Sequence, residues 1–250
     1  MDTKNSTYAS DEITSVSGAA LKVSLGGLLT LLMGFGVQVV TAFFYGAGAE
    51  MDAFLTASII PLYFQLVLLS SLPFVVIPAF VEHENRGRLD DAWALVGACL
   101  WVISGIFSLI AIAGSLSSMG LISIIAPGFN PAKAAIASQM LGVLMLGIPF
   151  MGIAYLTSGI QNVQNRWFWP AAAAAIGSAG NLLTLLLFHK SLGVMALAWG
   201  GLAAAILQAL ITAIPVLKPA LKRSLPLSSP YVRELGRLIT PFIVFGFLIC

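Results

Sequence analysis

The stretch YGAGAEMDAF, residues Tyr45–Phe54, interrupts a long apolar N-terminal half and decides the fold. The segments on either side of it, Val23–Phe44 and Ala53–Val81, contain no charged residue. Two uncharged runs of this length around a short polar turn are typical of two membrane-crossing helices. Gly46 or Gly48 can adopt the positive φ that ends a helix. We therefore predict a membrane hairpin whose turn lies at these residues.

Composition extends this interpretation to the whole chain. Of the 250 residues, 59% are hydrophobic and 9% are charged, with a mean hydropathy of +0.98. Soluble domains carry about 25% charged residues, so a water-soluble globular fold is excluded. A net charge of +2 from scattered basic residues does not favour nucleic-acid binding. Cys99 and Cys250 each lie in an apolar run, which favours small buried side chains over a disulfide.

We expect an all-α polytopic membrane protein with six complete spans and a truncated seventh. Three prolines in the second span, at positions 61, 73 and 78, predict kinks or a break there. The last thirteen residues are too few to cross about 30 Å of hydrocarbon, so we expect the sequence to stop partway through a helix. The expected spans are residues 22–45, 52–81, 92–117, 132–159, 168–188 and 191–217, with a turn at His189–Lys190 and a polar loop at Gln161–Arg166. The expected domains are a polar, disordered cytosolic tail (1–21), the six-helix lobe (22–217), a cytosolic linker (218–237) and the start of the seventh span (238–250).

The distribution of basic residues predicts the orientation. If the N-terminus is cytosolic, ten basic residues fall inside and two, Lys133 and Lys190, fall outside. This bias predicts a cytosolic N-terminus and an outward-facing Tyr45–Phe54 turn. The ten are Lys4, Lys22, Arg86, Arg88, Arg166, Lys218, Lys222, Arg223, Arg233 and Arg237.

No pattern typical of catalysis, nucleotide binding or a metal site is found, so we expect neither an enzyme nor a cofactor. His83, between Glu82 and Glu84, fits a solvated mixed-charge run better than a metal site. His189, at a helix end, fits an interfacial residue better than a proton relay. The spans carry uncharged polar residues, which either form interhelical hydrogen bonds of about 0.6 kcal/mol each or line a wet cavity for a polar substrate. These are Gln38, Thr41, Gln65, Gln139, Asn181, Thr184 and Gln208.

Four segments, in this order and at these helix positions, resemble the N-terminal half of the MurJ/MviN lipid II flippases. They are YGAGAEMDAF (45–54), APGF (126–129), SGIQNVQNRWFWP (158–170) and ALAWGGLAAAILQ (196–208). That family belongs to the multidrug/oligosaccharidyl-lipid/polysaccharide exporter superfamily. The resemblance implies a two-lobed transporter of the bacterial inner membrane. By alternating access it would flip an undecaprenyl-pyrophosphate-linked precursor for peptidoglycan and the cell wall.

The resemblance also exposes a difference. Such flippases are expected to carry cavity-facing arginines suited to pyrophosphate in the first two spans. Aligned on the turn, those positions hold Leu31, Val37, Phe43, Gln65 and Leu66. Either another cation supplies the charge, or the substrate is a different lipid-linked oligosaccharide or exopolysaccharide precursor.

The family is also about twice this length. We therefore expect three partners: a missing C-terminal lobe, in cis or in trans, membrane lipids and the lipid-linked glycan. The alternative is a non-transporting scaffold or a fragment.

The substrate-binding candidates are Gln38, Asp52, Gln65, Asn162, Arg166 and Asn181. Arg166 is the arginine within the matched segments, and it either holds a substrate phosphate or anchors the cytosolic end of its helix.

Overall fold

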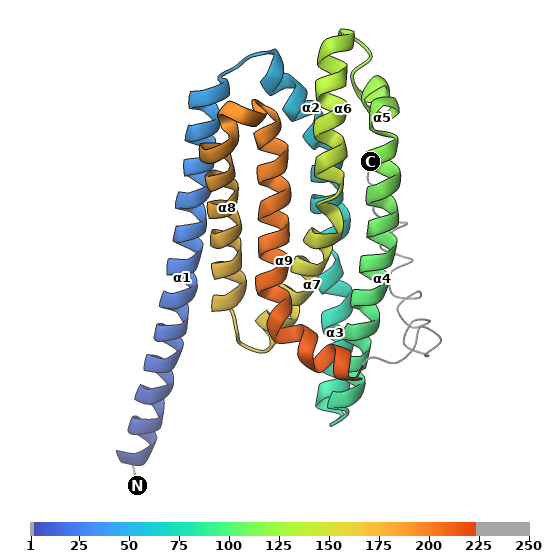
Figure 1. Ribbon diagram of the computed structural model, residues 1–250. Helices are drawn as coiled ribbons and strands as arrows, with labels where there is room; N and C mark the ends of the chain where they lie inside the picture. The colour runs from blue at the N-terminus through green and yellow to red at the C-terminus, as the bar shows by residue number, and fades with distance from the viewer. Residues whose placement is uncertain (1–2, 224–250) are drawn as a thin grey trace.

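The computed structural model describes residues 3–223, and every regular element in this range is a helix. The predicted seventh span and most of the linker lie outside the described residues. Figure 1 shows the helices as one upright bundle. The elements are α1 (Thr3–Tyr45), α2 (Ala49–Tyr63), the π-helix η1 (Phe64–Leu69), α3 (Leu72–Asn85), α4 (Leu89–Leu116), α5 (Ser118–Ile125), α6 (Pro131–Met145), α7 (Ile148–Val163), α8 (Phe168–Leu192) and α9 (Met195–Arg223).

Six segments of the described chain are long and apolar enough to cross a membrane, as predicted. The second span combines α2, η1 and α3, and the fourth combines α6 and α7. The spans run alternately up and down in Figure 1, as a polytopic bundle requires. Their bounds are Ser24–Tyr45, Ala49–Asn85, Leu89–Leu116, Pro131–Val163, Phe168–Leu192 and Met195–Ala220.

The turn within Tyr45–Phe54 joins the first two spans. Gly46 has φ +56°, so it takes the left-handed conformation in which a side chain would be strained. Its N–H donates to the carbonyl of Ala42 at 3.0 Å and ends α1. Helix α2 then starts at Ala49. The predicted turn between the first two apolar helices is therefore confirmed.

Proline breaks two of the spans. Pro73 cannot donate a hydrogen bond to the carbonyl of Leu69, and the second span passes through the π-helix η1 just before it. The N–H of Ser70 reaches back to the carbonyl of Gln65 at 3.1 Å, which closes the wider turn. In the fourth span, the break at Leu146–Gly147 was not predicted. Pro149, at the second position of α7, is its physical cause.

Two expected boundaries were wrong. Helix α1 begins at Thr3, so residues 3–21 are helical rather than disordered; this stretch has no proline, and its one glycine is Gly18. The turn expected at residues 189–190 lies at Gly193, where φ is +54°. Within the connection expected after the third span, residues 118–125 form helix α5.

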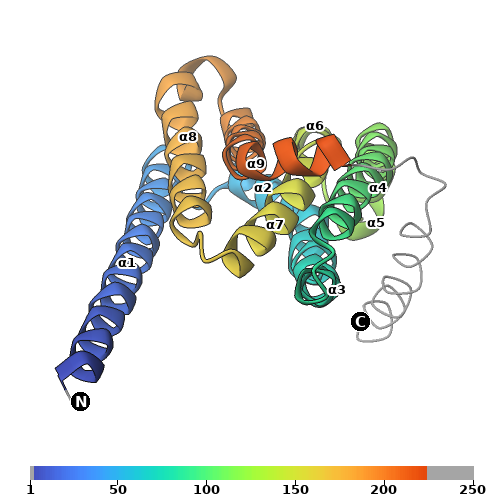
Figure 2. The ribbon, with the colours of Figure 1, turned by 90° about the horizontal axis from the view of Figure 1, so that it is seen from below.

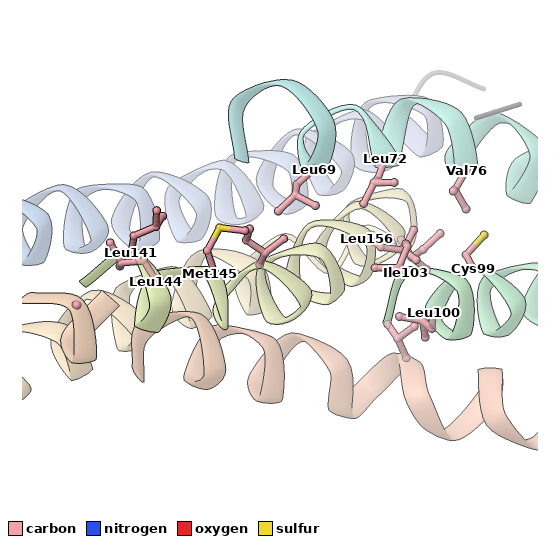
Figure 3. Close-up of a cluster of buried hydrophobic side chains, with 14 of the residues drawn as sticks. Leu69, Leu72, Val76, Cys99, Leu100, Ile103, Leu141, Leu144, Met145 and Leu156 are labelled. Carbon is pink, nitrogen blue, oxygen red and sulfur yellow. The ribbon is translucent and has the colours of Figure 1, made fainter. Parts of the chain in front are cut away.

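The core of the bundle lies around α7 and α9, which pack against each other. Helix α9 packs against α4, α6, α7 and α8, whereas α1 packs mainly along α8 at one edge (Figure 2). Figure 3 shows the apolar cluster that second, third and fourth spans share, with Leu69, Ile103 and Leu156 pointing toward one another. Cys99 belongs to this cluster as a free, buried thiol, as predicted; Cys250 is outside the described residues.

The connections gather at two ends of the bundle. The α1–α2 and α8–α9 connections lie at the upper end in Figure 1, and the α3–α4 and α7–α8 connections lie at the lower end. The Tyr45 hydroxyl donates to the carbonyl of Gly193 at 2.8 Å, which ties the two upper connections together. Arg86, Arg88 and Arg166 thus belong to one end of the bundle and Lys190 to the other. The predicted orientation likewise assigns these arginines and Lys190 to opposite sides of the membrane.

Candidate functional site

An ion pair joins the start of the second span to the start of the fourth. The Lys133 ammonium donates to Oδ2 of Asp52 at 3.0 Å. It also lies 4.2 Å from the ring centroid of Phe129, a cation–π contact. The side chain of Asn130 accepts from the Lys133 N–H at 2.8 Å and caps helix α6, which fixes the backbone beneath the ammonium. Asp52 is therefore held by a cation that was not predicted as its partner.

Gln65 lies in the π-helix of the second span and reaches the fourth. Its Nε2 donates to the Tyr155 hydroxyl at 3.2 Å. Both side chains are partly buried, so the pair forms a polar contact between η1, which separates α2 from α3, and α7. Short π-helical segments inside α-helices are frequent at functional sites.

Asn181 lies in the middle of α8 and packs on Gly200 of α9. A Cβ added at Gly200 would clash with Oδ1 of Asn181, so the glycine makes room for this amide. Oδ1 is buried and accepts no hydrogen bond in the described structure. The residue thus serves helix packing, and its carbonyl oxygen retains unused hydrogen-bonding capacity.

The other three predicted residues are exposed. Gln38 lies on α1, Asn162 at the end of α7 and Arg166 in the α7–α8 turn. The turn is well braced: Asn165 has φ +59°, the Arg166 N–H donates to the carbonyl of Gln161 at 2.8 Å, and the Trp167 indole N–H donates to the carbonyl of Asn162 at 2.8 Å.

The structure does not gather the six predicted residues into one constellation. Asp52 follows the α1–α2 connection, and Arg166 belongs to the α7–α8 connection at the opposite end of the bundle. Gln65 and Asn181 lie within the spans between those ends, where Gln65 contacts Tyr155 and Asn181 contacts Gly200. The arrangement offers polar groups along the length of the lobe rather than a single pocket of charge.

A buried polar network between α7 and α9 was not predicted from the sequence. Thr157 and Gln161 on α7 face Thr212 on α9, and all three are fully buried. The Thr157 hydroxyl lies 2.9 Å from the Thr212 hydroxyl, and Gln161 Nε2 donates to the carbonyl of Thr212 at 2.7 Å. Gln161 had been assigned to a polar loop because asparagines and an arginine follow it. The four-residue spacing of Thr157 and Gln161, which places both on one face of a helix, was the available signal.

The two histidines lie in different surroundings. In the described part of the chain, no group of three or more His, Cys, Asp or Glu residues is placed to hold a metal ion. His83 is buried, so its assignment to a solvated run was wrong: α3 continues to Asn85 and turns this side chain inward. His189 stacks on Phe44, with ring centroids 4.0 Å apart and planes 8° apart.

Three of the five positions at which the resemblance leads one to expect arginine are apolar and exposed. Leu31 is 72% exposed, Phe43 is 81% exposed and Leu66 is 64% exposed. These surfaces present no cation to an anionic ligand.

Comparison with known proteins places these features in context. The family model described as "Lipid II flippase MurJ" matches residues 39–249. A probable lipid II flippase MurJ from Aquifex aeolicus is 28% identical over 74% of this chain and 37% of its own length. The lipid II flippase MurJ from Burkholderia cenocepacia is 26% identical over 80% of this chain and 40% of its own length.

Solved structures share the fold. A lipid II flippase MurJ in an inward closed conformation superposes with a TM-score of 0.72 at 18% identity, over 90% of this chain and 47% of that one. A transporter of the MOP superfamily from Pyrococcus furiosus superposes with a TM-score of 0.73 at 16% identity, over 92% of this chain and 52% of that one. The chain therefore spans about half the length of these structures and about two fifths of the curated relatives.

Proposed function

Because this chain belongs to the lipid II flippase MurJ family, we propose that it forms the N-terminal lobe of a flippase in the bacterial inner membrane. The substrate is an undecaprenyl-pyrophosphate-linked cell-wall precursor of the lipid II type, moved across the bilayer by alternating access for peptidoglycan biosynthesis. The observation that carries the proposal is the family match across 211 residues, from 39 to 249. The six-span helical lobe is consistent with it.

The proposed orientation places the N-terminus and the α3–α4 and α7–α8 connections in the cytosol. Arg86, Arg88 and Arg166 then lie on the cytosolic side, and Lys190 lies on the outer side. In this orientation the Asp52–Lys133 pair belongs to the outer end of the lobe and Arg166 to the inner end. The two charged features would meet the substrate at different stages of its passage.

The proposed substrate contacts are Gln38, Asp52, Gln65, Asn162, Arg166 and Asn181. Arg166 is the proposed phosphate partner, because it is exposed, whereas Arg86 pairs with Glu82 and Arg88 pairs with Asp91 at 3.8 Å. The uncharged members would hydrogen-bond sugar hydroxyls. The family comprises lipid transporters rather than enzymes, and we propose no bond-making step for this chain.

A second lobe, in cis or in trans, completes the proposed transporter. Alternating access needs two bodies around a shared path, and the matched relatives are more than twice as long as the matched segment. A half-length scaffold without transport activity is the competing proposal, and it is separable by the experiment below.

A different lipid-linked glycan is the second candidate substrate. The apolar side chains at positions 31, 43 and 66 favour it, because a diphosphate in a low-dielectric path needs cationic partners. A precursor recognised mainly through its sugar would rely less on such partners.

The test is complementation of a bacterium whose own lipid II flippase is depleted. The gene product that contains this chain, residues 1–250 alone, and residues 1–250 co-expressed with the C-terminal half of a MurJ relative are compared at equal membrane abundance. Rescue of growth and cell shape by the first supports the lipid II proposal. Rescue only when a second lobe is supplied supports the two-lobed arrangement.

Two outcomes contradict the proposal. Failure of all three, with normal membrane insertion, points to another lipid-linked glycan or to a scaffold. Equal rescue by Arg166→Ala and Arg166→Lys in the active form removes Arg166 as the phosphate partner, since only lysine retains the charge.

A further inference from the structure

The two halves of the second span are packed in different ways. The first half, α2, buries only small side chains along one stripe: Ala53, Ala57 and Pro61. The second half, α3, buries large apolar ones, and Figure 3 shows two of them, Leu72 and Val76, pointing into the core cluster. Small side chains give a smooth contact, whereas large ones interlock with their neighbours and resist sliding. Within the described residues, α3 is therefore the half that the core fixes.

The neighbours of the two halves differ as well. Helix α2 packs chiefly against α6, and its other sides are open: Leu55, Ile59 and Leu62 are each about half exposed. Helix α3 packs against both α4 and α7. A Cβ added at Gly159 of α7 would lie 2.8 Å from Cβ of Pro73, so α7 makes room for the first turn of α3. Helix α2 thus has one main partner, and α3 has two.

The link between the halves is not a regular α-helix. The π-helix η1 occupies Phe64–Leu69, and a proline stands on each side of it, at positions 61 and 73. Neither proline has an N–H to contribute to the helical ladder. The N–H of Ser70 donates five residues back, to the carbonyl of Gln65 at 3.1 Å. Helices bend at prolines and at π-turns, so this link is the place at which the span can bend.

The far end of α2 is held by a short connection and one ion pair. Gly46, with φ +56°, and Gly48 lie in the connection to α1, and glycine tolerates the backbone changes that a moving connection requires. In the first turn of α2, Asp52 pairs with Lys133 of α6 at 3.0 Å. The Asp52 side chain is 65% exposed. Exposed pairs of this kind are weak, so the contact can open.

We propose that η1 is a hinge about which α2 swings across the smooth face of α6, and that the Asp52–Lys133 ion pair is the latch that holds α2 in the position described here. Helix α3 stays in the core, so one membrane span combines a moving half with a static half. Hinges of this kind need only a few residues that absorb the change in backbone angles. The proposal concerns the lobe itself and does not depend on which lipid is transported.

The test is a set of distances measured by double electron–electron resonance on the gene product that contains this chain, in lipid nanodiscs. Nitroxide labels are attached to cysteines placed at exposed sites, in a background without other accessible cysteines. One label is always at Leu109 of α4, which packs against several helices. The other is at Leu55 of α2, at Phe74 of α3, or at Leu187 near the end of α8.

The Leu55 pair should show a second distance population, because α2 moves relative to the core. The Phe74 pair should show one population, because α3 is fixed. The Leu187 pair should also show one, and it controls for fraying of a helix near the same end of the bundle. A single population for all three pairs overturns the proposal.

Variants of the ion pair test the latch. Asp52→Asn and Lys133→Met should each raise the ratio of the second to the first Leu55 population by about 1.4- to 5-fold, the range that the energies of exposed ion pairs imply. Glu82→Gln is the matched control, because it removes the exposed pair of Glu82 with Arg86 at the far end of α3 and should leave the ratio unchanged. An unchanged ratio in both latch variants, or an equal rise in Glu82→Gln, removes the pair as the latch.

Variants of the prolines locate the hinge. Pro73→Ala restores an N–H beside η1 and should reduce the second Leu55 population, because a more regular helix bends less. Pro78→Ala is the control, since this proline lies inside α3, beyond the proposed hinge, and should leave the population unchanged. Pro61→Ala, on the other side of η1, takes the place of Pro73→Ala if that variant does not fold. Equal effects at the hinge proline and at Pro78 overturn the assignment of the hinge to η1.

Discussion

The first and fourth spans are equally hydrophobic and yet have opposite surroundings. Both have a mean hydropathy of 1.9. Only 6% of the apolar window of the first span is buried within the protein, against 61% for the fourth. The fourth span passes through the core between α4 and α9, and the first lies at the edge along α8 (Figure 2). Hydropathy thus reports that a segment can cross a bilayer, and it does not report whether lipid or protein surrounds it.

The largest expected effect contrasts a leucine in each of these two spans. Leu156→Ala opens a cavity in the core and should cost about 2–5 kcal/mol of unfolding free energy. Leu32→Ala, at an exposed position of α1, should stay within about 0.5 kcal/mol. Unfolding in detergent is followed with a thiol-reactive dye in a Cys250→Ser background, in which buried Cys99 reports exposure. Similar losses at both positions would contradict the comparison.

The next effect tests the packing of the first span against α8. A Cβ at Gly26 would lie 2.7 Å from Cβ of Ala171 on α8, whereas one at the adjacent Gly27 would meet nothing within 4 Å. Gly26→Val should therefore cost about 1–3 kcal/mol more than Gly27→Val, through overpacking. Both variants change helix propensity alike, so the difference in unfolding temperature between them isolates this packing. No difference would show that α1 shifts freely on α8.

A smaller effect separates the hydrogen bonds of the two spans. Tyr155→Phe removes the Gln65 contact in the fourth span and should cost about 0.6 kcal/mol. Tyr45→Phe removes the exposed bond to the carbonyl of Gly193 at the end of the first span, and it should cost less because water replaces the partner. The same unfolding assay measures both, and a larger loss for Tyr45→Phe would reverse the ranking.

The smallest effect concerns the ion pair that fastens the second span to the fourth. Asp52 is 65% exposed, and the Lys133 side chain is 19% exposed. A double-mutant cycle with Asp52→Asn and Lys133→Met should give a coupling at the low end of roughly 0.2–1 kcal/mol. The coupling should shrink as salt is raised, because exposed charges are screened. A coupling free energy that does not change with salt concentration would indicate that the pair is less exposed to solvent than the structure shows.

Much of the fold could be predicted because the signals are local. The uncharged runs predicted six spans, Gly46 marked the first turn, and Pro73 marked the break in the second span. Two helix boundaries were predicted wrongly because a stronger local pattern lay beside the residue that sets the boundary. The break at Leu146–Gly147 follows from Pro149, which had been absorbed into an apolar run. The turn at Gly193 was assigned to the polar residues just before it.

The candidate site was less predictable, since partners lie far apart in sequence. Lys133 is 81 residues from Asp52, and Tyr155 is 90 residues from Gln65. No property of either residue alone reveals such a pairing. Gln161 shows the same limit: next to asparagines and an arginine it resembles a loop residue, and the packing of α9 makes it a fully buried one.

By itself, the sequence determined the membrane environment, the six spans, the first turn and membership of the family, because hydropathy, glycine, proline and motif order act within short segments. Only the tertiary structure decided which equally apolar spans face lipid and which form the core. It also decided which polar side chains meet: Asp52 with Lys133, and Gln161 with Thr212. The physical reason is that burial and pairing are properties of contacts between helices, and those contacts exist only once the helices have packed.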